Sequence, residues 1–305
     1  MEALLIANPN ASTTSDRVID DVRHVLGRRY GRVDVARTNH RHHATELAAE
    51  AVAAGIGLVA ALGGDGTANE VIQALATTDV PLAVLPGGGA NVLARTLGLP
   101  EDPVRAARLL LPEDREPKTR RVGLGRANDR WFAIAAGFGF DASVVEAIER
   151  HPRLKRVLRD GAFVALGLAA WFASTDRHEV PLEIKLPDGS SSGGYWVVVA
   201  SNSDPFTYLG ALPMRLTPGV RFDDGIDVLA VRTASTSHVL RLVGRVFAGA
   251  RHQRDPAVRL FRELDALTIR APAPRPFQVD GDAAGTTDTL RIVRCPHTLD
   301  LLVVS

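Results

Sequence analysis

Cysteine and lysine are scarce in this chain of 305 residues, which has one cysteine, Cys295, and lysine only at positions 118, 155 and 185. A single thiol excludes both a disulfide and a cysteine-based metal site within the chain, and it favours a reducing compartment. Arginine supplies nearly all the basic residues, and with so much alanine this indicates a bias in coding composition. A single arginine is therefore weaker evidence than usual for phosphate recognition.

Excess charge and long apolar runs are also lacking. The formal net charge is +1, and no basic stripe carries interleaved aromatic residues, so nucleic acid is not an expected partner. The longest apolar stretch, about residues 162–173, is shorter than the ~20 residues of a spanning helix. The start, MEALLIANPN, does not resemble an export signal. We expect a cytoplasmic protein, with peripheral attachment to the inner face of the plasma membrane and a homo-oligomer both left open.

Short apolar runs alternate with helical periodicity in the first hundred residues. Strands are expected at 3–8, 33–37, 56–62 and 81–86, with helices at 15–30, 44–55, 68–76 and 91–98. This order predicts a parallel sheet covered by helices on both faces, with ligands beyond the carboxyl ends of its strands. Composition changes at 111–121, the predicted domain connection. Beyond it, strand-like runs and turn signals predict a mainly antiparallel domain, with helices near 153–175 and 236–254.

A glycine loop, GGDGT at 63–67, lies between a predicted strand and a predicted helix. Glycine lets the backbone approach a ligand, and the N–H groups at a helix start point at an anion, so a phosphate ester is the natural occupant. The loop is not a P-loop, because it has no lysine. A carboxylate at Asp65 beside phosphates requires a cation such as Mg²⁺ between them. A plain turn in which Asp65 caps the helix is the alternative.

Further segments extend the predicted rim. A second glycine cluster at 86–100 repeats the arrangement, so two adjacent loops could hold a polyphosphate. NPNAST at 8–13 adds small polar groups, although a turn with a Ser or Thr helix cap explains it almost as well. We interpret AGFGFDAS at 136–143 as close helix–strand packing. We interpret the histidines of NHRHHATE as a solvated surface cluster, because they lack a regular ligand spacing and a carboxylate partner.

Two acidic clusters occur late in the chain. Asp223, Asp224 and Asp227 surround a glycine and form a possible oxygen-ligand site for Mg²⁺ or Ca²⁺, with a hairpin-type turn as an equal alternative. Asp280 and Asp282 flank a glycine at the end of a predicted strand. An Asp-Gly pair is also what any hairpin turn would use, so this cluster alone does not establish a site.

Taken in order, these segments resemble the diacylglycerol kinase catalytic family, which includes bacterial lipid kinases and sphingosine kinases. The resemblance covers nearly the whole chain. It is carried by NPN near the start, GGDGT, LPGGGANVLARTLGLP, GFGFDA, SNSDPFTYLG at 201–210, FDDGIDVLAV and QVDGD. The GGxANV sequence is similar to an actinobacterial-type branch.

The resemblance implies two domains. The first, residues 1–120 with a returning strand at about 296–305, would be a nucleotide-binding α/β domain of the NAD kinase/diacylglycerol kinase type, a parallel sheet with flanking helices. The second, residues 121–295, would be a mainly antiparallel β-sandwich that contributes to the lipid site.

The resemblance also implies the site residues. The nucleotide would contact Asn8, Pro9, Asn10, Ala11, Ser12, Thr38, Gly63, Gly64, Asp65, Gly66, Thr67, Asn69, Gly88, Gly89 and Asn91. Asp280 matches the catalytic base, Asp282 stands where a glutamate is usual, and Asp65 would organise Mg²⁺. Asp224, Asp227 and the backbone of Leu229 match a structural Mg²⁺ site. At 88–92 the chain has GGANV where Gly-Thr-x-Asn-Asp is common, so we expect an altered site in an active enzyme.

The implied function is an ATP- and Mg²⁺-dependent lipid kinase, a phosphotransferase with an alcohol acceptor that converts diacylglycerol to phosphatidic acid in phospholipid biosynthesis. Basic and apolar segments at 151–172 and 241–254 could rest on an anionic membrane, although core helices with solvated arginines explain each equally well. Two alternatives are a kinase for another acceptor (a sphingoid base, a glycosylated phosphoinositide or an NAD-like soluble substrate) and a nucleotide or lipid sensor without activity.

Overall fold

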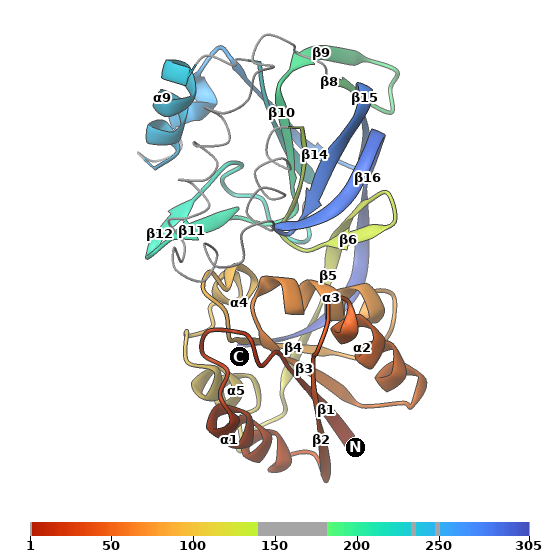
Figure 1. The fold of residues 1–305 in the computed structure, drawn as a ribbon, viewed down its shortest axis with the longest axis vertical. Helices are drawn as coiled ribbons and strands as arrows, with labels where there is room; N and C mark the ends of the chain where they lie inside the picture. Colours follow the sequence, from red (N-terminus) through yellow and green to blue (C-terminus); the bar gives the residue numbers. More distant parts are fainter. Residues whose placement is uncertain (1, 140–181, 233–235, 248–250, 305) are drawn as a thin grey trace. The chain divides into compact units, whose positions relative to one another are not determined.

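The computed structural model describes residues 2–139, 182–232, 236–247 and 251–304. Its contacts divide the chain into a first unit, Met1–Leu124 with Pro296–Ser305, and a second unit, Gly125–Cys295. Strands β5 (Lys118–Ala127) and β16 (Asp282–Val303) each run from one unit into the other (Figure 1). The predicted helix at 153–175 and the part of AGFGFDAS beyond residue 139 lie outside the described residues.

The first unit contains a parallel sheet with strand order β4-β3-β1-β2. Its strands are β1 (Glu2–Ala7), β2 (Arg32–Arg37), β3 (Leu58–Gly63) and β4 (Leu82–Pro86). Every residue of β3 and β4 is buried, as expected for central strands with both faces covered. The end of β16 adds a further parallel strand beside β4, with Leu301 opposite Leu82.

Helices cover both faces of this sheet. They are α1 (Asp16–Gly27), α2 (His43–Ala53), α3 (Asp65–Leu75), α4 (Val92–Thr96) and α5 (Pro103–Leu110). Figure 1 shows α1 packed with α5 on one side of the sheet and α2 packed with α3 on the other. The cap of α1 is Ser15, whose Oγ accepts a hydrogen bond from the backbone N–H of Val18 at 3.3 Å. The predicted α/β architecture is confirmed.

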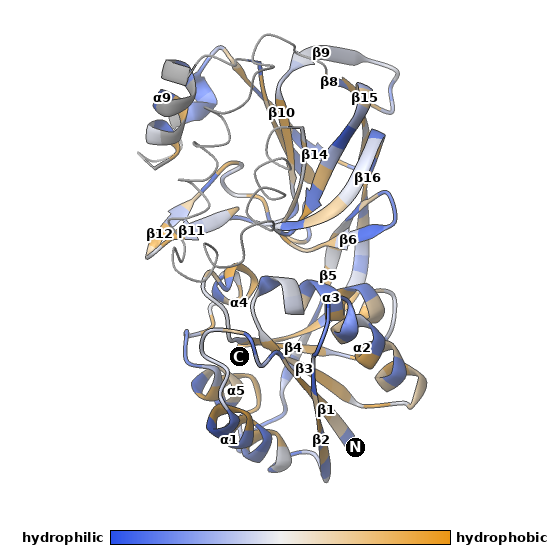
Figure 2. Cartoon of the chain, viewed as in Figure 1, coloured by the Kyte–Doolittle hydropathy of each residue, from blue (hydrophilic) through white to orange (hydrophobic). Residues whose placement is uncertain are grey.

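The second unit is built from antiparallel strands, as the sequence predicts. Its main path is β14-β13-β10-β7-β15, and β15 also pairs with β8 and β16. The strands are β6 (Arg130–Phe132), β7 (Ala135–Gly139), β8 (Leu182–Lys185), β9 (Ser191–Tyr195), β10 (Val197–Ser201), β11 (Thr207–Leu209), β12 (Leu212–Met214), β13 (Ile226–Val231), β14 (Val258–Leu264) and β15 (Ala266–Val279). Phe132, Phe138 and Tyr195 are the largest fully buried side chains of its core. Figure 2 shows the hydrophobic residues along β10.

Helical structure in the second unit includes α9 (Thr236–Phe247) and the short 3₁₀ helix η1 (Arg251–Arg254), both within the predicted segment 236–254. None of the helices in the described part of the chain is long and apolar enough to cross a membrane.

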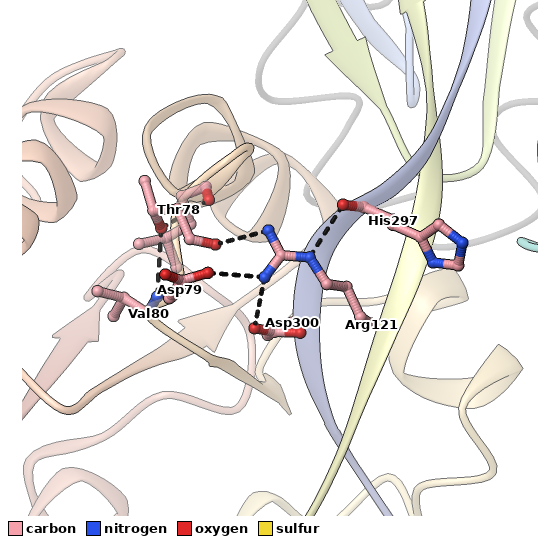
Figure 3. Close-up of polar contacts among 7 residues, drawn as sticks. Thr78, Asp79, Val80, Arg121, His297 and Asp300 are labelled. Carbon is pink, nitrogen blue, oxygen red and sulfur yellow. Dashed lines mark hydrogen bonds and ion pairs between the residues drawn. The ribbon is translucent and has the colours of Figure 1, made fainter.

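Arg121, in the segment predicted to connect the domains, holds the returning strand in the first unit (Figure 3). Its Nε donates to the carbonyl of His297 at 2.9 Å, and its Nη1 donates to Asp79 at 2.8 Å and Asp300 at 3.2 Å. Its Nη2 donates to the carbonyl of Thr78 at 3.5 Å. The planar guanidinium therefore joins β5 both to the end of β16 and to the loop before β4.

Replacing Arg121 by lysine is expected to lower the melting temperature, because one ammonium cannot reproduce donors pointing in several directions. Thermal unfolding followed by circular dichroism measures the loss. The matched control is Arg17→Lys, since the Arg17 side chain is 91% exposed and pairs only loosely with Asp21 at 3.9 Å. Equal melting temperatures for the two variants would contradict this role of Arg121.

Candidate functional site

Three loops at the carboxyl ends of β1, β3 and β4 are joined by hydrogen bonds. The N–H of Thr13 donates to the carbonyl of Gly87 at 3.0 Å, and the N–H of Gly87 donates to the carbonyl of Gly63 at 2.7 Å. Nδ2 of Asn8 donates to Oγ1 of Thr67 at 3.2 Å. The structure thus brings together the loops that the sequence assigns to the nucleotide, although they come from distant parts of the chain.

The glycines of two of these loops allow their backbones to touch. A Cβ atom on Gly87 would lie 2.9 Å from Cα of Gly63, and a Cβ atom on Gly88 would lie 2.6 Å from Cα of Gly64. Both distances are too short for a side chain. The sequence suggested that glycine is needed for the approach of a ligand, whereas the structure shows a requirement for the approach of one loop to the other.

The N-terminus of α3 has the form of an anion site. Its N-cap residue is Gly64, which has no side chain to accept a hydrogen bond from the N–H groups of the first turn. Uncapped N–H groups together with the helix dipole favour a negatively charged ligand. Asp65 is the first residue of the helix rather than its cap, so the alternative of a plain capped turn at Asp65 is wrong.

Asp65 links α3 to α4. Its Oδ1 accepts a hydrogen bond from the N–H of Leu93 at 3.0 Å. The residue as a whole is partly exposed, but the carboxyl group is enclosed by protein atoms. This burial raises the pKa of Asp65, while the N–H groups of Leu93 and Val92 and the charge of Arg95 act in the opposite direction. The carboxylate therefore serves as a side-chain acceptor for the start of α4.

Asn91 precedes α4 but does not supply the side-chain acceptor for its first turn, which comes from Asp65 instead. Asn91 is the N-cap residue of α4 and has a left-handed backbone with φ 46°, a conformation that asparagine tolerates. Its side chain accepts a hydrogen bond from the N–H of Gly88 and donates one to the carbonyl of the same residue, both at 2.8 Å. Asn91 thus closes the glycine loop and makes no cap hydrogen bond to α4.

The other predicted nucleotide residues lie in or next to these loops. The N–H of Asn10 donates to Oδ1 of Asn8 at 3.0 Å, and Oγ of Ser12 donates to the carbonyl of Gly87 at 3.4 Å. The N–H of Thr38 donates to the carbonyl of Ala7 at 3.0 Å, which places Thr38 directly after β2. Pro9, Ala11 and Gly89 belong to the same loops, and Gly66 is the second residue of α3. Asn69 is buried in α3, where its Oδ1 accepts from Gln73 at 3.1 Å.

Asp280 and Gly281 form the turn between β15 and β16. Both have positive φ values, 49° and 85°, as a two-residue hairpin turn of type I′ requires. The Asp280 carboxylate accepts three backbone hydrogen bonds, from Ala133 at 2.9 Å, Ile134 at 2.8 Å and Ala135 at 3.0 Å. The hairpin tip is thereby fastened to the start of β7.

These three hydrogen bonds bear on the predicted role of Asp280 as the catalytic base. The three N–H groups engage both oxygens of the carboxylate and fix its orientation. Asp282, at the start of β16, is partly exposed. The geometry therefore favours a positioning role for Asp280 and leaves Asp282 as the stronger candidate for accepting a proton.

At the predicted structural Mg²⁺ site, the positively charged side chain of Arg262 lies next to Asp227. The Asp227 side chain is 4% exposed and forms an ion pair through its Oδ2 with Nη1 of Arg262. Its Oδ1 accepts the N–H of Glu263 at 2.9 Å. Asp224 is exposed, and its Oδ2 accepts the N–H of Arg221 at 3.1 Å. Because the guanidinium of Arg262 already lies against Asp227 and would repel a divalent cation, these residues do not fit a Mg²⁺ site without rearrangement.

The histidine cluster has a carboxylate partner that sequence analysis did not identify. Ligand atoms of His40, His43 and Glu46 lie within 4.8 Å of one another, the one such group among the described residues. However, the His40 and His43 rings are stacked at 26°, and Nδ1 of His43 accepts the N–H of Asn39 at 3.2 Å. Stacked rings do not direct their lone pairs to a common point, so the interpretation as a surface cluster is retained.

Models of two known protein domains match the two parts of this chain. The model of the diacylglycerol kinase catalytic domain matches residues 2–126, and the model of the YegS C-terminal NAD kinase beta sandwich-like domain matches residues 134–303. The chain belongs to the diacylglycerol kinase catalytic domain family. This membership confirms the resemblance seen in the motifs, the sandwich-like second domain and the expectation that the chain is a kinase.

Relatives of this kinase occur in several bacteria. A diacylglycerol kinase of Mycobacterium tuberculosis is 30% identical over 292 residues, which cover 86% of this chain and 89% of the relative. A protein of Chromohalobacter salexigens named "Probable lipid kinase YegS-like" is 35% identical over 192 residues, which cover 61% of this chain and 57% of the relative. The match to this second relative thus spans little more than half of its length.

Solved structures share the fold of the kinase. A crystal structure described as a diacylglycerol kinase from Bacillus anthracis has a TM-score of 0.73 at 20% identity, covering 99% of this chain and 96% of that chain. An NAD kinase from Archaeoglobus fulgidus in complex with ATP has a TM-score of 0.51 at 11% identity, covering 100% and 94%. At these identities the likeness supports the fold alone.

Glu70 is a residue of the kinase that sequence analysis missed. Helix α2 follows His42, which has φ 69° and makes no side-chain cap hydrogen bond. The Glu70 carboxylate, from α3, accepts the N–H groups of His42 at 2.8 Å and Ala44 at 3.1 Å. The start of α2 is therefore capped by the neighbouring helix. No local sequence signal marks this role, because the partners are 28 and 26 residues away.

Proposed function

We propose that this protein is a lipid kinase that transfers the γ-phosphate of ATP to the hydroxyl group of diacylglycerol. Its family and the name of the Mycobacterium tuberculosis relative support this class of acceptor. The observation that carries the proposal is the junction of three loops around the uncapped N-terminus of α3. Such a surface can receive the phosphates of a nucleotide through backbone N–H groups.

In this proposal the phosphates of ATP lie against Gly63–Thr67 and the loop Gly88–Asn91. Hydrogen bonds from both loops would orient the γ-phosphate for in-line attack, which is the main demand of phosphoryl transfer. Mg²⁺ bound with ATP would neutralise charge on the phosphate oxygens. The Asp65 carboxylate would help to hold the Mg²⁺ ion, directly or through water, while its hydrogen bond to Leu93 keeps the starts of α3 and α4 together.

The proton of the lipid hydroxyl would pass to a carboxylate as the oxygen attacks phosphorus and ADP leaves. We assign this step to Asp282, because the oxygens of Asp280 already accept three backbone N–H groups. Asp280 would instead hold the β15–β16 hairpin, and with it Asp282, in place. Sequence motifs alone assigned the base to Asp280.

Basic side chains of the second unit bear on the proposed contact with an anionic membrane. Segment 151–172 lies outside the described residues. In the second candidate segment, residues 241–254, Arg241 is exposed. Arg245 of the same segment forms an ion pair with the buried Asp255. The charge of Arg245 is therefore already paired within the unit, which leaves fewer unpaired basic side chains for an anionic surface than the sequence suggested.

The test is incubation with γ-labelled ATP, with and without Mg²⁺, and one acceptor at a time. The acceptors are diacylglycerol, a sphingoid base, a glycosylated phosphoinositide and NAD, each lipid in mixed micelles. Labelled phosphatidic acid that requires Mg²⁺ is the expected product. Preferential labelling of another acceptor would replace the proposed substrate, and ATP binding without any labelled product would favour a sensor.

A further inference from the structure

We propose that the guanidinium of Arg262 supplies the positive charge at Asp227 that the family resemblance assigns to a structural Mg²⁺ ion. The second unit would then be stabilised by a cation built into the chain. This role of Arg262 concerns the stability of the second unit and does not depend on which acceptor the kinase uses.

Asp227 is a buried carboxylate with a donor on each of its two oxygens. Its side chain is 4% exposed, and its two oxygens have different donors: Arg262 binds Oδ2, and the backbone N–H of Glu263 binds Oδ1 at 2.9 Å. A buried carboxylate must be paired, since leaving it without a counter-charge is costly. The ion pair meets this requirement without a metal.

Arg262 is positioned by more than Asp227. Its Nη1 also donates to the carbonyl of Pro218 at 3.2 Å, and its Nη2 donates to Oε1 of Gln253 at 3.4 Å. The guanidinium of β14 therefore contacts β13, the loop that precedes it and η1. A structural cation would be expected to join segments in the same way, and the planar fork of arginine can do so with several donors.

The remaining predicted ligands are poorly placed for a metal shared with Asp227. Asp224 is exposed, and one of its oxygens accepts the N–H of Arg221. Leu229 lies in the interior of β13, opposite Val199 of β10 and Leu260 of β14. A divalent cation next to Asp227 would also be repelled by Arg262, and displacing the guanidinium would break its bonds to Pro218 and Gln253.

The first experiment measures thermal unfolding of the nucleotide-free full-length protein in EDTA and in millimolar MgCl₂. The melting temperature of the wild type is expected to be the same in both within about 1 °C, since a ΔΔG of even 1 kcal/mol would shift it by about 2–4 °C. A wild-type melting temperature that falls in EDTA and recovers with Mg²⁺, and no longer does so in Asp227→Asn, would overturn the proposal.

The second experiment removes the guanidinium. Arg262→Met is expected to lower the melting temperature by about 5–10 °C in either buffer, because it leaves a buried carboxylate unpaired. The control is Arg259→Met on the same strand, where the exposed guanidinium lies 5.7 Å from the ring centre of Phe261. Equal melting temperatures for the two variants would also overturn the proposal.

The third experiment uses a variant at an exposed position, so its result does not depend on whether Arg262→Met folds. Isothermal titration of Mg²⁺ into nucleotide-free wild-type protein and into Asp224→Asn is expected to give the same binding isotherm. Asp224 is exposed, so this variant should fold normally. Binding that is lost in Asp224→Asn would place a metal at the predicted site and contradict the role given to Arg262.

Discussion

Replacing Asp65 by asparagine is expected to lower phosphoryl transfer by about 10²-fold or more while leaving the protein folded. Oδ1 of asparagine can still accept the N–H of Leu93, so the link between α3 and α4 should survive. What asparagine lacks is the negative charge that would attract Mg²⁺. Initial rates at saturating ATP, together with melting temperatures, measure the two effects separately.

Asp65→Ala tests the structural role of the Asp65 side chain. It removes the acceptor for Leu93 and is expected to cost about 0.5–2 kcal/mol of stability in addition to the loss of transfer. Asp102→Ala is the matched control, because Asp102 caps α5 by accepting the N–H of Arg105 at 2.7 Å. It should lose comparable stability but keep its activity. Wild-type transfer by the folded Asp65→Asn protein would remove Asp65 from the proposed site.

Replacing Asp282 by asparagine is expected to lower transfer by about 10²–10⁴-fold, the usual contribution of a general base, with little change in melting temperature. Asp280→Asn should behave differently. The amide of asparagine offers one acceptor oxygen where the carboxylate accepts three N–H groups through two oxygens, so one buried N–H would face an NH₂ group. We expect a loss of about 1–3 kcal/mol in the free energy of unfolding.

Measuring both rate and stability separates these two aspartates. Asp288→Asn, at an exposed position on the same strand β16, is the control for removing one negative charge. If Asp282→Asn transfers phosphate at the wild-type rate, while Asp280→Asn is stable and inactive, the base belongs to Asp280 as the motif suggested. The opposite result would support the assignment made from the hydrogen bonds.

The fold class and the loops that the proposal uses could be predicted from the amino-acid sequence. Alternation of apolar runs with helical periodicity is a local property, and it identified β1 to β4 and α1 to α4 within a few residues. The glycine loops were also visible, because glycine after a strand and before a helix has few structural explanations. The family motifs then connected these loops to a kinase.

The partners of the individual carboxylates became visible in the three-dimensional structure alone. Asp65 accepts a hydrogen bond from a residue 28 positions away, Asp280 from residues about 145 positions away, and Asp227 pairs with Arg262, 35 positions away. A carboxylate next to glycine has the same local sequence whether it binds a metal, accepts a proton or holds a loop. Its partners decide its chemistry, and they are brought to it by the packing of strands and helices that are far apart in the chain.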